Sequence, residues 1–248
     1  MNSDLYDHPA LYDELFPVGE HLPYYTDLAR KASGDVLELA CGTGQIAVPI
    51  ASAGLPIAGL DLSSVLLGAA RERAMAANVS LEFVLGDMRN FDLGRKFALI
   101  FIARNSLLHL HSIEDLLAAF TAINRHLAHG GVFAFDIFNP NVRLLGRPAG
   151  QRFPVFEKDT ASFGKLNVEQ TTDYDPATQV GHSNWFVSAV GEPDAWKLSL
   201  DLRNIFAQEL PLLLAAGGFR LEQRAGDLSQ SPFNSTSRFQ VCVCRAVS

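Results

Sequence analysis

Two hydrophobic periods alternate along residues 35–138. Short apolar runs of the kind that form buried strands are followed by longer segments with the three-to-four-residue spacing of helices. The strand-like runs cover 36–40, 56–61, 81–87, 97–103 and 131–138, and the helical segments cover about 45–53, 63–77 and 113–128. Strands that alternate with helices pair in parallel and carry helices on both faces. The pattern therefore predicts a doubly wound α/β fold with a mostly parallel, Rossmann-like sheet.

The pattern changes after residue 140. Residues 151–206 contain several strand-like runs, separated by turn-forming clusters at 175–179 and 191–195. This spacing predicts an antiparallel β insertion after the fifth strand that lies over the sheet. A helix within 207–218 and two closing strands then complete a seven-stranded sheet. We therefore expect a core of 1–140 and 205–248, with the insertion at 141–204.

The composition narrows the class of protein. Hydrophobic residues make up 48% of the 248-residue chain, 19% of residues are charged, and the net charge is -7, which disfavours disorder and a nucleic-acid partner. Neither a basic leader nor an apolar run of about 18 residues occurs, so we expect a cytoplasmic protein without a membrane partner. Three cysteines are too few for a disulfide framework, and no histidine spacing implies a metal.

Gly42 and Gly44 form a turn between the first strand and the first helix of the core. With Ala47 they match the pattern G-x-G-x-x-A, in which a side chain would block the approach of a ligand to the backbone. Asp61 ends the next strand, where a carboxylate can accept hydrogen bonds from ribose hydroxyls. Both features suit NAD(P) as well as other adenosine cofactors, so an NAD(P)-dependent oxidoreductase is one interpretation.

Three further features disfavour a dinucleotide. The carboxylate of Glu38 lies at the ligand end of the first strand, and it would repel a pyrophosphate by about 4 kcal/mol at ~4 Å, whereas an amino-acid ammonium would be attracted. Asp87 and Met88 follow the third strand, where an acid and a polarisable side chain could contact an adenine. The chain continues into two closing strands and lacks the second mononucleotide-binding half that a dinucleotide needs.

These residues resemble the class I methyltransferases that use S-adenosylmethionine. Small-molecule members are the most similar, including amino-sugar N-methyltransferases and related natural-product methyltransferases. Ala40 stands where the family usually has its first glycine, which is a mild departure. The resemblance implies S-adenosyl-L-methionine as cofactor and S-adenosyl-L-homocysteine as product. It is carried by 11–16, the glycine motif at 38–44, the ribose acid within 59–63, the adenine acid within 86–89, and by 97–110, 129–132 and the final strands.

The resemblance also implies a role for each matched position. The turn from Ala40 to Gly44 would follow the methionine part, Asp61 would hold the ribose, and Ala103 would offer its carbonyl to the methionine amine. Tyr12 and Tyr25 resemble N-terminal aromatics that close over the cofactor, although core or surface packing is an equal alternative. The expected cofactor-binding residues are Tyr12, Tyr25, Glu38, Ala40, Cys41, Gly42, Thr43, Gly44, Asp61, Leu62, Asp87, Met88 and Ala103.

The methyl acceptor should bind beyond the carboxyl ends of the parallel strands, under the insertion. His109 is the candidate general base, because histidine titrates near neutral pH, although a histidine that only packs its loop is an alternative. Asp136 and Asn139 flank the end of the fifth strand, where polar groups could orient an acceptor. The candidate substrate residues are Arg104, Asn105, Asn139, Trp185 and Arg203, of which the arginines could instead be solvated.

The sequence is therefore compatible with three functions. The leading one is transfer of a methyl group to a nitrogen or oxygen of a small molecule. An oxidoreductase and a non-catalytic cofactor-binding module on the same fold are the alternatives. Positioning of the two reactants can contribute roughly 7–11 kcal/mol, against roughly 3–5 kcal/mol for a base, so a weakly marked base does not exclude methyl transfer. A homodimer is compatible with the sequence.

Overall fold

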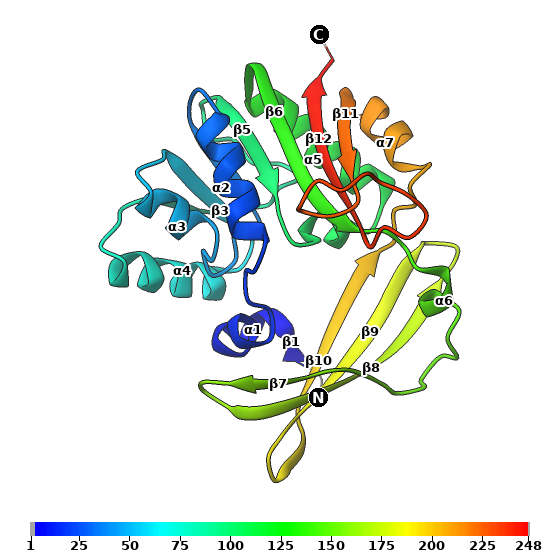
Figure 1. Cartoon of the computed structure of the whole chain (residues 1–248). Helices are drawn as coiled ribbons and strands as arrows, with labels where there is room; N and C mark the ends of the chain where they lie inside the picture. Colours follow the sequence, from blue (N-terminus) through cyan, green and yellow to red (C-terminus); the bar gives the residue numbers. More distant parts are fainter. Residues whose placement is uncertain (1–2, 248) are drawn as a thin grey trace. The chain divides into compact units, whose positions relative to one another are not determined.

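The computed structural model describes residues 3–247 and divides the chain into two compact units (Figure 1). The core unit comprises Val18–Asn139 and the residues from Ile205 onward. The insertion unit comprises the residues up to Pro17 together with Pro140–Asn204. The N-terminal residues, which the sequence analysis placed in the core, therefore group with the insertion.

The core unit contains a seven-stranded sheet with the order β11-β12-β6-β5-β2-β3-β4. Strands β2 to β6 are parallel, and β12 pairs antiparallel with both β6 and β11. The strand order reverses between β2 and β5, which is where ligands bind in doubly wound folds. The expected sheet is confirmed. Its strands are β2 (Val36–Leu39), β3 (Ile57–Asp61), β4 (Glu82–Leu85), β5 (Phe97–Ile102), β6 (Leu127–Phe138), β11 (Phe219–Ala225) and β12 (Phe239–Ala246).

Helices cover both faces of this sheet because successive strand residues point in opposite directions. Phe101 and Ala134 pack with α2 and α3, whereas Phe133 and Phe219 contact Phe120 of α5 on the opposite face. Side-chain oxygens of Ser63 and Ser112 cap α4 and α5. The helices are α2 (His21–Lys31), α3 (Ala47–Ser52), α4 (Ser64–Ala76), η2 (Ser106–His109), α5 (Ile113–His126) and α7 (Leu210–Ala216).

The insertion unit is built on a five-stranded sheet with the order β1-β10-β9-β8-β7. All of its pairings are antiparallel except β1 with β10, so the expected antiparallel insertion is confirmed. Leu5, Leu11 and Leu15 pack into its apolar core beside Val168 and Val187, which explains why the N-terminal segment belongs here. The elements are β1 (Ser3–Asp4), η1 (Leu5–Asp7), α1 (Pro9–Leu15), α6 (Val142–Leu145), β7 (Phe153–Thr160), β8 (Gly164–Asp175), β9 (Val180–Ala189) and β10 (Glu192–Arg203).

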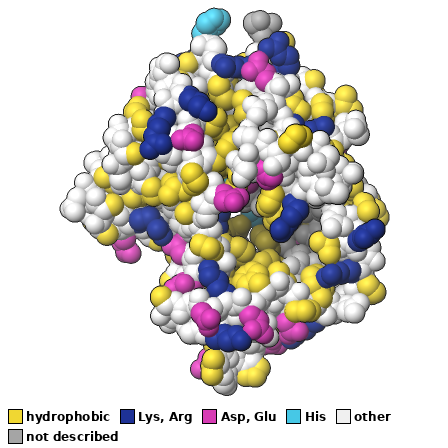
Figure 2. Space-filling view, viewed as in Figure 1, with side chains coloured by type: hydrophobic (Ala, Val, Ile, Leu, Met, Phe, Trp, Pro, Cys, Tyr) yellow, Lys and Arg dark blue, Asp and Glu magenta, His cyan; other side chains and the backbone are white. Residues whose placement is uncertain are grey.

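The charged side chains show no broad patch of one sign on the face drawn in Figure 2, where basic and acidic groups are interspersed. Between residues 3 and 247, no helix is long and apolar enough to cross a membrane. Cys41, Cys242 and Cys244 are all buried and unpaired, and the last two lie on one face of β12, as the alternation of the sequence predicts.

Candidate cofactor and acceptor site

The glycine turn after β2 uses left-handed backbone at three alternate positions. Ala40 has a φ of 55°, Gly42 of 54° and Gly44 of 73°. A Cβ at Gly42 would come no closer than 4.0 Å to Leu66, so the missing side chain leaves open space for a ligand. A Cβ at Gly44 would meet Val48 at 3.0 Å and Ala70 at 3.3 Å, so this glycine serves the packing of α3 and α4.

Ala40 departs from the family pattern at a greater cost than the sequence suggests. The left-handed conformation costs about 1–2 kcal/mol for a residue with a Cβ atom, whereas glycine adopts it freely. The turn nevertheless forms, because its neighbours hold it: the Cys41 amide donates to Leu60 O at 3.0 Å and the Gly44 amide to Cys41 O at 2.9 Å. The Cys41 thiol points into the core against Gly59, so Cys41 can meet a ligand only through its backbone.

Asp61 connects the glycine turn to the loop after β3. Its carboxylate accepts the amide of Gly42 at 2.7 Å and the amide of Ser63 at 2.8 Å, and the residue is only 7% exposed. Burial raises the pKa of Asp61, while the amides of Ser63 and Gly42 oppose that rise. A carboxylate has about four acceptor positions, so the remaining lone pairs can take hydroxyl groups.

Glu38 carries a buried carboxyl oxygen that lacks a hydrogen-bond partner among residues 3–247. The residue is 3% exposed, and the unpartnered atom is Oε2. Burial raises the pKa of Glu38 well above its usual value, and the amide of Ala47 and the charge of Arg104 act against this rise. An unpaired buried acceptor is costly, and a cationic ligand group at the end of β2 would supply the missing donor.

The expected adenine residues lie beyond β3 and β4. Leu62 is 70% exposed, which leaves an apolar surface next to Asp61. The carboxylate of Asp87 is held by Arg89, whose Nε lies 3.0 Å from Oδ1 and 2.9 Å from Oδ2, and Arg89 also reaches Asp115 at 3.0 Å. The Arg89 guanidinium lowers the pKa of Asp87. Asp87 is thus ionised and oriented by a neighbour that the sequence analysis did not pair with it, while Met88 beside it is half-buried.

The turn after β5 is strained and lies beside the glycine turn. Arg104 and Asn105 are consecutive left-handed residues, with φ of 59° and 65°, and neither is glycine. Such residues cost of order 1–2 kcal/mol each, with less for asparagine, and need support from their surroundings. The amide of Ser106 donates to the carbonyl of the buried Ala103 at 3.2 Å, and Asn105 Oδ1 accepts the amide of Phe138 at 2.6 Å. Asn105 therefore holds β6 in addition to any role toward a substrate.

Asp136 on β6 supplies most of that support, and its connections were missed from the sequence. This residue is 0% exposed, and its two carboxylate oxygens accept the Arg104 amide at 3.0 and 3.1 Å. Its carboxylate also accepts the Tyr25 hydroxyl at 2.6 Å and lies 3.2 Å from His21 Nε2. Asp136 is thus occupied by this chain's own donors and is not open to an acceptor. The sequence feature that could have indicated this buried hydrogen-bonded acid is its position within the apolar run at 131–138.

Tyr25 is a core residue. Its ring is fully buried and stacks on Phe101 with the ring centroids 4.4 Å apart. Of the roles that the sequence left open, core packing is therefore the one that the structure shows for this tyrosine. Burial raises the pKa of Tyr25 well above its usual value, and Asp136 adds to the effect, so the hydroxyl remains protonated as a donor.

The remaining candidate residues are divided between the two units. In the core unit, His109 is half-buried at the end of η2, and Asn139 Nδ2 donates to Ser237 O at 2.9 Å. In the insertion unit, Trp185 and Tyr12 join one aromatic series through Phe16, with centroid separations of 5.2 and 5.6 Å. Arg203 is only 4% exposed, and its Nη2 donates to Gln179 Oε1 at 3.2 Å, so it does not face solvent.

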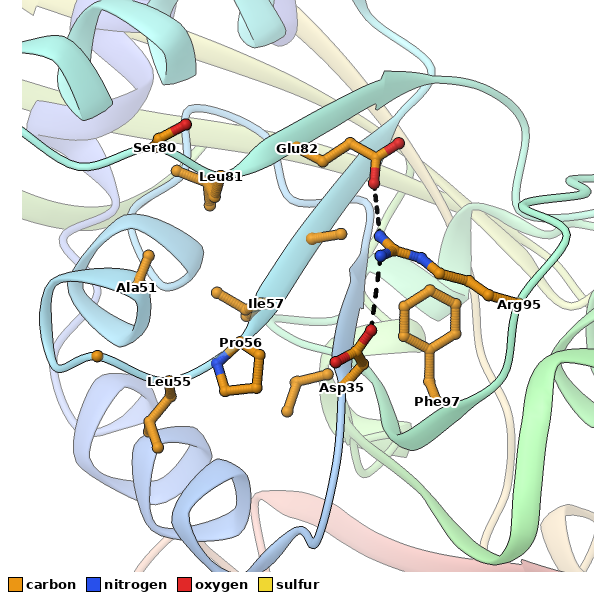
Figure 3. A pocket seen from close by; sticks show the side chains of 13 residues that line it. Asp35, Ala51, Leu55, Pro56, Ile57, Ser80, Leu81, Glu82, Arg95 and Phe97 are labelled. Atoms are coloured by element: carbon orange, nitrogen blue, oxygen red, sulfur yellow. Dashed lines mark hydrogen bonds and ion pairs between the residues drawn. The ribbon is translucent and has the colours of Figure 1, made fainter.

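A surface hollow of about 450 Å³ lies at the other edge of the core sheet, at the amino ends of the parallel strands (Figure 3). Arg95 bridges Asp35 and Glu82 across it, at 3.5 and 2.5 Å, and lies over the ring of Phe97. The residues with ligand chemistry are at the carboxyl ends, where doubly wound sheets bind ligands, so this hollow is not the candidate site. Among the described residues, no His, Cys, Asp and Glu side chains gather as metal binding would require.

Comparison with known proteins shows which class of protein the core unit resembles. Residues 36–131, which contain the glycine turn, Asp61 and Asp87, match the family model described as "Methyltransferase domain". Over these residues the chain is similar to methyltransferases. The resemblance to methyltransferases drawn from the sequence is confirmed over these residues, and S-adenosylmethionine, rather than NAD(P), is the cofactor expected of them.

Curated relatives of the methyltransferase domain include enzymes named for amino sugars. The dTDP-3-amino-3,4,6-trideoxy-alpha-D-glucopyranose N,N-dimethyltransferase of Streptomyces venezuelae is 36% identical over 139 residues, which cover 52% of this chain and 56% of that protein. The putative methyltransferase YqeM of Bacillus subtilis (strain 168) is 31% identical over 52% of this chain and 53% of its own length. The chain thus spans about half the length of the curated relatives that it matches.

Solved structures share the fold over both units. The CcbJ methyltransferase from Streptomyces caelestis covers 100% of both chains with a TM-score of 0.85 and 27% identity. CalS10 from Micromonospora echinaspora, described as an amino pentose methyltransferase with S-adenosylmethionine bound, covers 98% of both chains with a TM-score of 0.72 and 21% identity, a likeness that shows the fold alone. The methyltransferase fold therefore includes the antiparallel insertion.

Proposed function

We propose that this protein is an S-adenosylmethionine-dependent methyltransferase that acts on an amino nitrogen of a hydroxylated small molecule, such as an amino sugar. The observation that carries the proposal is the arrangement after β2 and β3, where the open Gly42 turn is tied to Asp61 beside the unpartnered oxygen of Glu38. Nitrogen is preferred over oxygen as the acceptor because relatives matched over about half the chain are named as amino-sugar N,N-dimethyltransferases.

The core unit offers a separate group for each part of the cofactor. Asp61 accepts the ribose hydroxyls with its free lone pairs, and exposed Leu62 packs on the adenine. Asp87, kept ionised by Arg89, accepts the adenine amino group beside Met88. Glu38 and the Ala103 carbonyl attract the ammonium of the methionine part, and the backbone of Cys41 and Thr43 follows its length.

When bound, S-adenosylmethionine supplies an activated methyl group on a sulfonium. The residues of this chain then need to hold the acceptor nitrogen in line with that group, and such positioning accounts for most of the rate gain in reactions of this kind. His109 is the group proposed to remove the proton from the acceptor amine. Arg104, Asn139, Trp185 and Arg203 are proposed to contact the acceptor, and residues 141–204 to cover it.

Calorimetry followed by a turnover assay tests the proposal. S-adenosylhomocysteine should bind the full-length protein, and Asp61→Ala should weaken this binding by 10-fold or more. In the turnover assay, mass spectrometry should then detect one or two methyl groups added to a nucleotide-linked 3-amino sugar. The same sugar with a 3-hydroxyl group is the matched control and should stay unmodified. Methylation of the hydroxyl sugar alone would contradict the nitrogen preference, and binding without turnover of a broad panel of amines would favour a non-catalytic module.

Two finer points belong to the same proposal. We place the protein in the cytoplasm, because three buried thiols that remain unpaired suit a reducing compartment.

A homodimer is also proposed. Light scattering at micromolar concentration tests it, and a mass of twice 27.0 kDa is expected.

A further inference from the structure

The turn at residues 103–105 occupies a defined place along the ligand-binding edge of the core sheet. The order β5-β2-β3-β4 puts Asp87 after β4, Asp61 on β3, the glycine turn after β2 and the 103–105 turn after β5. A cofactor whose adenine and ribose lie over β4 and β3 therefore extends its amino-acid part toward β2 and β5. The 103–105 turn borders that part and lies far from the adenine.

This turn does not hold its own shape. Arg104 and Asn105 are both left-handed, and neither is the glycine that such backbone favours. The main restraints come from β6: the Asp136 carboxylate accepts the Arg104 amide with both oxygens, and the Asp136 carbonyl accepts the Asn105 amide at 3.1 Å. Asp136 alone, on the neighbouring strand, thus accepts hydrogen bonds from both strained peptide groups.

Two further side chains hold the Asp136 carboxylate in place. The Tyr25 hydroxyl donates to Oδ1, and the His21 ring lies between Oδ2 and the carbonyl of Val18, with nitrogen–oxygen distances of 3.2 and 3.1 Å. Helix α2, which carries both residues, therefore helps to orient the acid.

We propose that Asp136 is a positioning residue for methyl transfer. Through the Arg104 and Asn105 amides it fixes the 103–105 turn in the conformation that binds the amino-acid part of the cofactor, and Tyr25 and His21 hold it for this task. Asp136 is fully buried and its oxygens are taken by these donors, so it acts through the turn and does not touch the cofactor. The proposal rests on the proposed function only as far as cofactor binding.

Two probes separate this role from general support of the fold. S-adenosylhomocysteine contains the amino-acid part, whereas 5′-methylthioadenosine has the same adenine, ribose and sulfur without it. Calorimetry should compare both ligands on the full-length wild type, on Asp136→Asn and on Tyr25→Phe, which keeps the ring stacked on Phe101. Asp27→Asn is the matched control, because this acid lies on α2 of the same unit with a side chain that is 61% exposed.

Asp136→Asn should raise the Kd of S-adenosylhomocysteine by 10-fold or more and that of 5′-methylthioadenosine by less than 2-fold. Tyr25→Phe should show the same selectivity with a smaller change, of about 3-fold, and Asp27→Asn should change neither Kd. Equal weakening of both ligands, or of neither, would overturn the proposal. If Asp136→Asn does not fold, the selectivity of Tyr25→Phe decides in the same way. Wild type that fails to bind S-adenosylhomocysteine would overturn the proposed function as well, whereas loss of selectivity alone would leave that function standing.

Discussion

Two neighbouring turns of the core sheet reach the same left-handed backbone by different means. The turn after β2 places glycine at two of its three left-handed positions, and the turn after β5 has none. Glycine makes the first turn possible locally and leaves room for a ligand beside it. The second turn depends on Asp136, which is remote in sequence and holds its amides from β6.

The comparison teaches that strain near a ligand can be supported from within the turn or from outside it. A turn supported by its own glycines is set by local sequence, and a Cβ at Gly44 would crowd Val48 and Ala70. A turn supported from outside tolerates ordinary side chains, such as Arg104 and Asn105, that can then face a substrate. Its weak point is the buried acid, because removing one partner of a buried network leaves the others unsatisfied.

The largest expected effect is the loss of the external support. Asp136→Ala leaves the Arg104 amide, the Tyr25 hydroxyl and the His21 ring without their acceptor, so we expect the free energy of unfolding to fall by about 3–5 kcal/mol. Urea unfolding followed by circular dichroism measures this change. Asp27→Ala, on the exposed side of α2, should lose less than ~0.5 kcal/mol. A loss at Asp136 no greater than in this control would show that the turn after β5 supports itself.

Substitution of each glycine in the turn after β2 should distinguish a role in packing from a role in ligand access. Gly44→Ala adds a Cβ 3.0 Å from Val48 and 3.3 Å from Ala70 in left-handed backbone, so we expect a loss of about 2–4 kcal/mol of stability. Gly42→Ala meets no close neighbour and should lose only about 1–2 kcal/mol, but its methyl group enters the ligand space and should weaken S-adenosylhomocysteine binding by at least 10-fold. Chemical unfolding and calorimetry on both variants test these expectations. Normal binding of S-adenosylhomocysteine by Gly42→Ala would contradict the assignment of Gly42 to ligand access.

Glu38, a buried acid at the start of the glycine turn, should make the free energy of unfolding depend on pH. Burial raises its pKa in the folded state well above the usual 4.5. The folded state therefore keeps the proton over a pH range in which the unfolded chain has released it, and stability falls as pH rises above the unfolded value. Glu38→Gln removes this dependence. Its advantage over wild type in free energy of unfolding should be absent near pH 4 and should grow toward pH 8. Each unit by which the folded and unfolded pKa values differ corresponds to about 1.4 kcal/mol.

Thermal unfolding across that pH range measures the effect of Glu38→Gln. The variant should also bind S-adenosylhomocysteine more weakly, because an amide, unlike an acid, cannot ionise to become the counter-ion of a bound ammonium. A constant difference in Tm from pH 4 to pH 8 would contradict the assignment of the raised pKa to Glu38.

The smallest expected effect is a gain. Ala40→Gly replaces a strained alanine in the turn after β2 and should stabilise the protein by about 0.5–1 kcal/mol, which is the relief of left-handed strain less the greater entropy of an unfolded glycine. Differential scanning calorimetry should show a Tm raised by about 1–3 °C for a chain of this size. Ala53→Gly, at a right-handed helix end, is the control and should not stabilise. Destabilisation by Ala40→Gly would mean that the alanine methyl group packs favourably.

Local patterns in the sequence predicted much of the fold and part of the site. The order of strands and helices from 36 to 138 follows from apolar periodicity, and the structure matches it to within a few residues at each end. Pro49 is compatible with the predicted helix, because α3 begins at Ala47 and the proline lies in the first turn, where its missing N–H breaks no helical hydrogen bond. The apolar character of residues 5–15 could not reveal which unit they join, because either core could bury Leu11 and Leu15.

By itself, the sequence determined the doubly wound core, the antiparallel insertion, the glycine turn and the acid at the end of β3, because each depends on periodicity or spacing within a few residues. Only the tertiary structure decided that Asp136 grips Arg104, Tyr25 and His21, since these contacts join residues 32, 111 and 115 positions apart. Tertiary packing also made Tyr25 a core residue and brought Asp115 to Arg89, which binds the neighbouring Asp87. Buried polar groups find partners wherever the fold brings a donor to an acceptor, and no local pattern records that meeting.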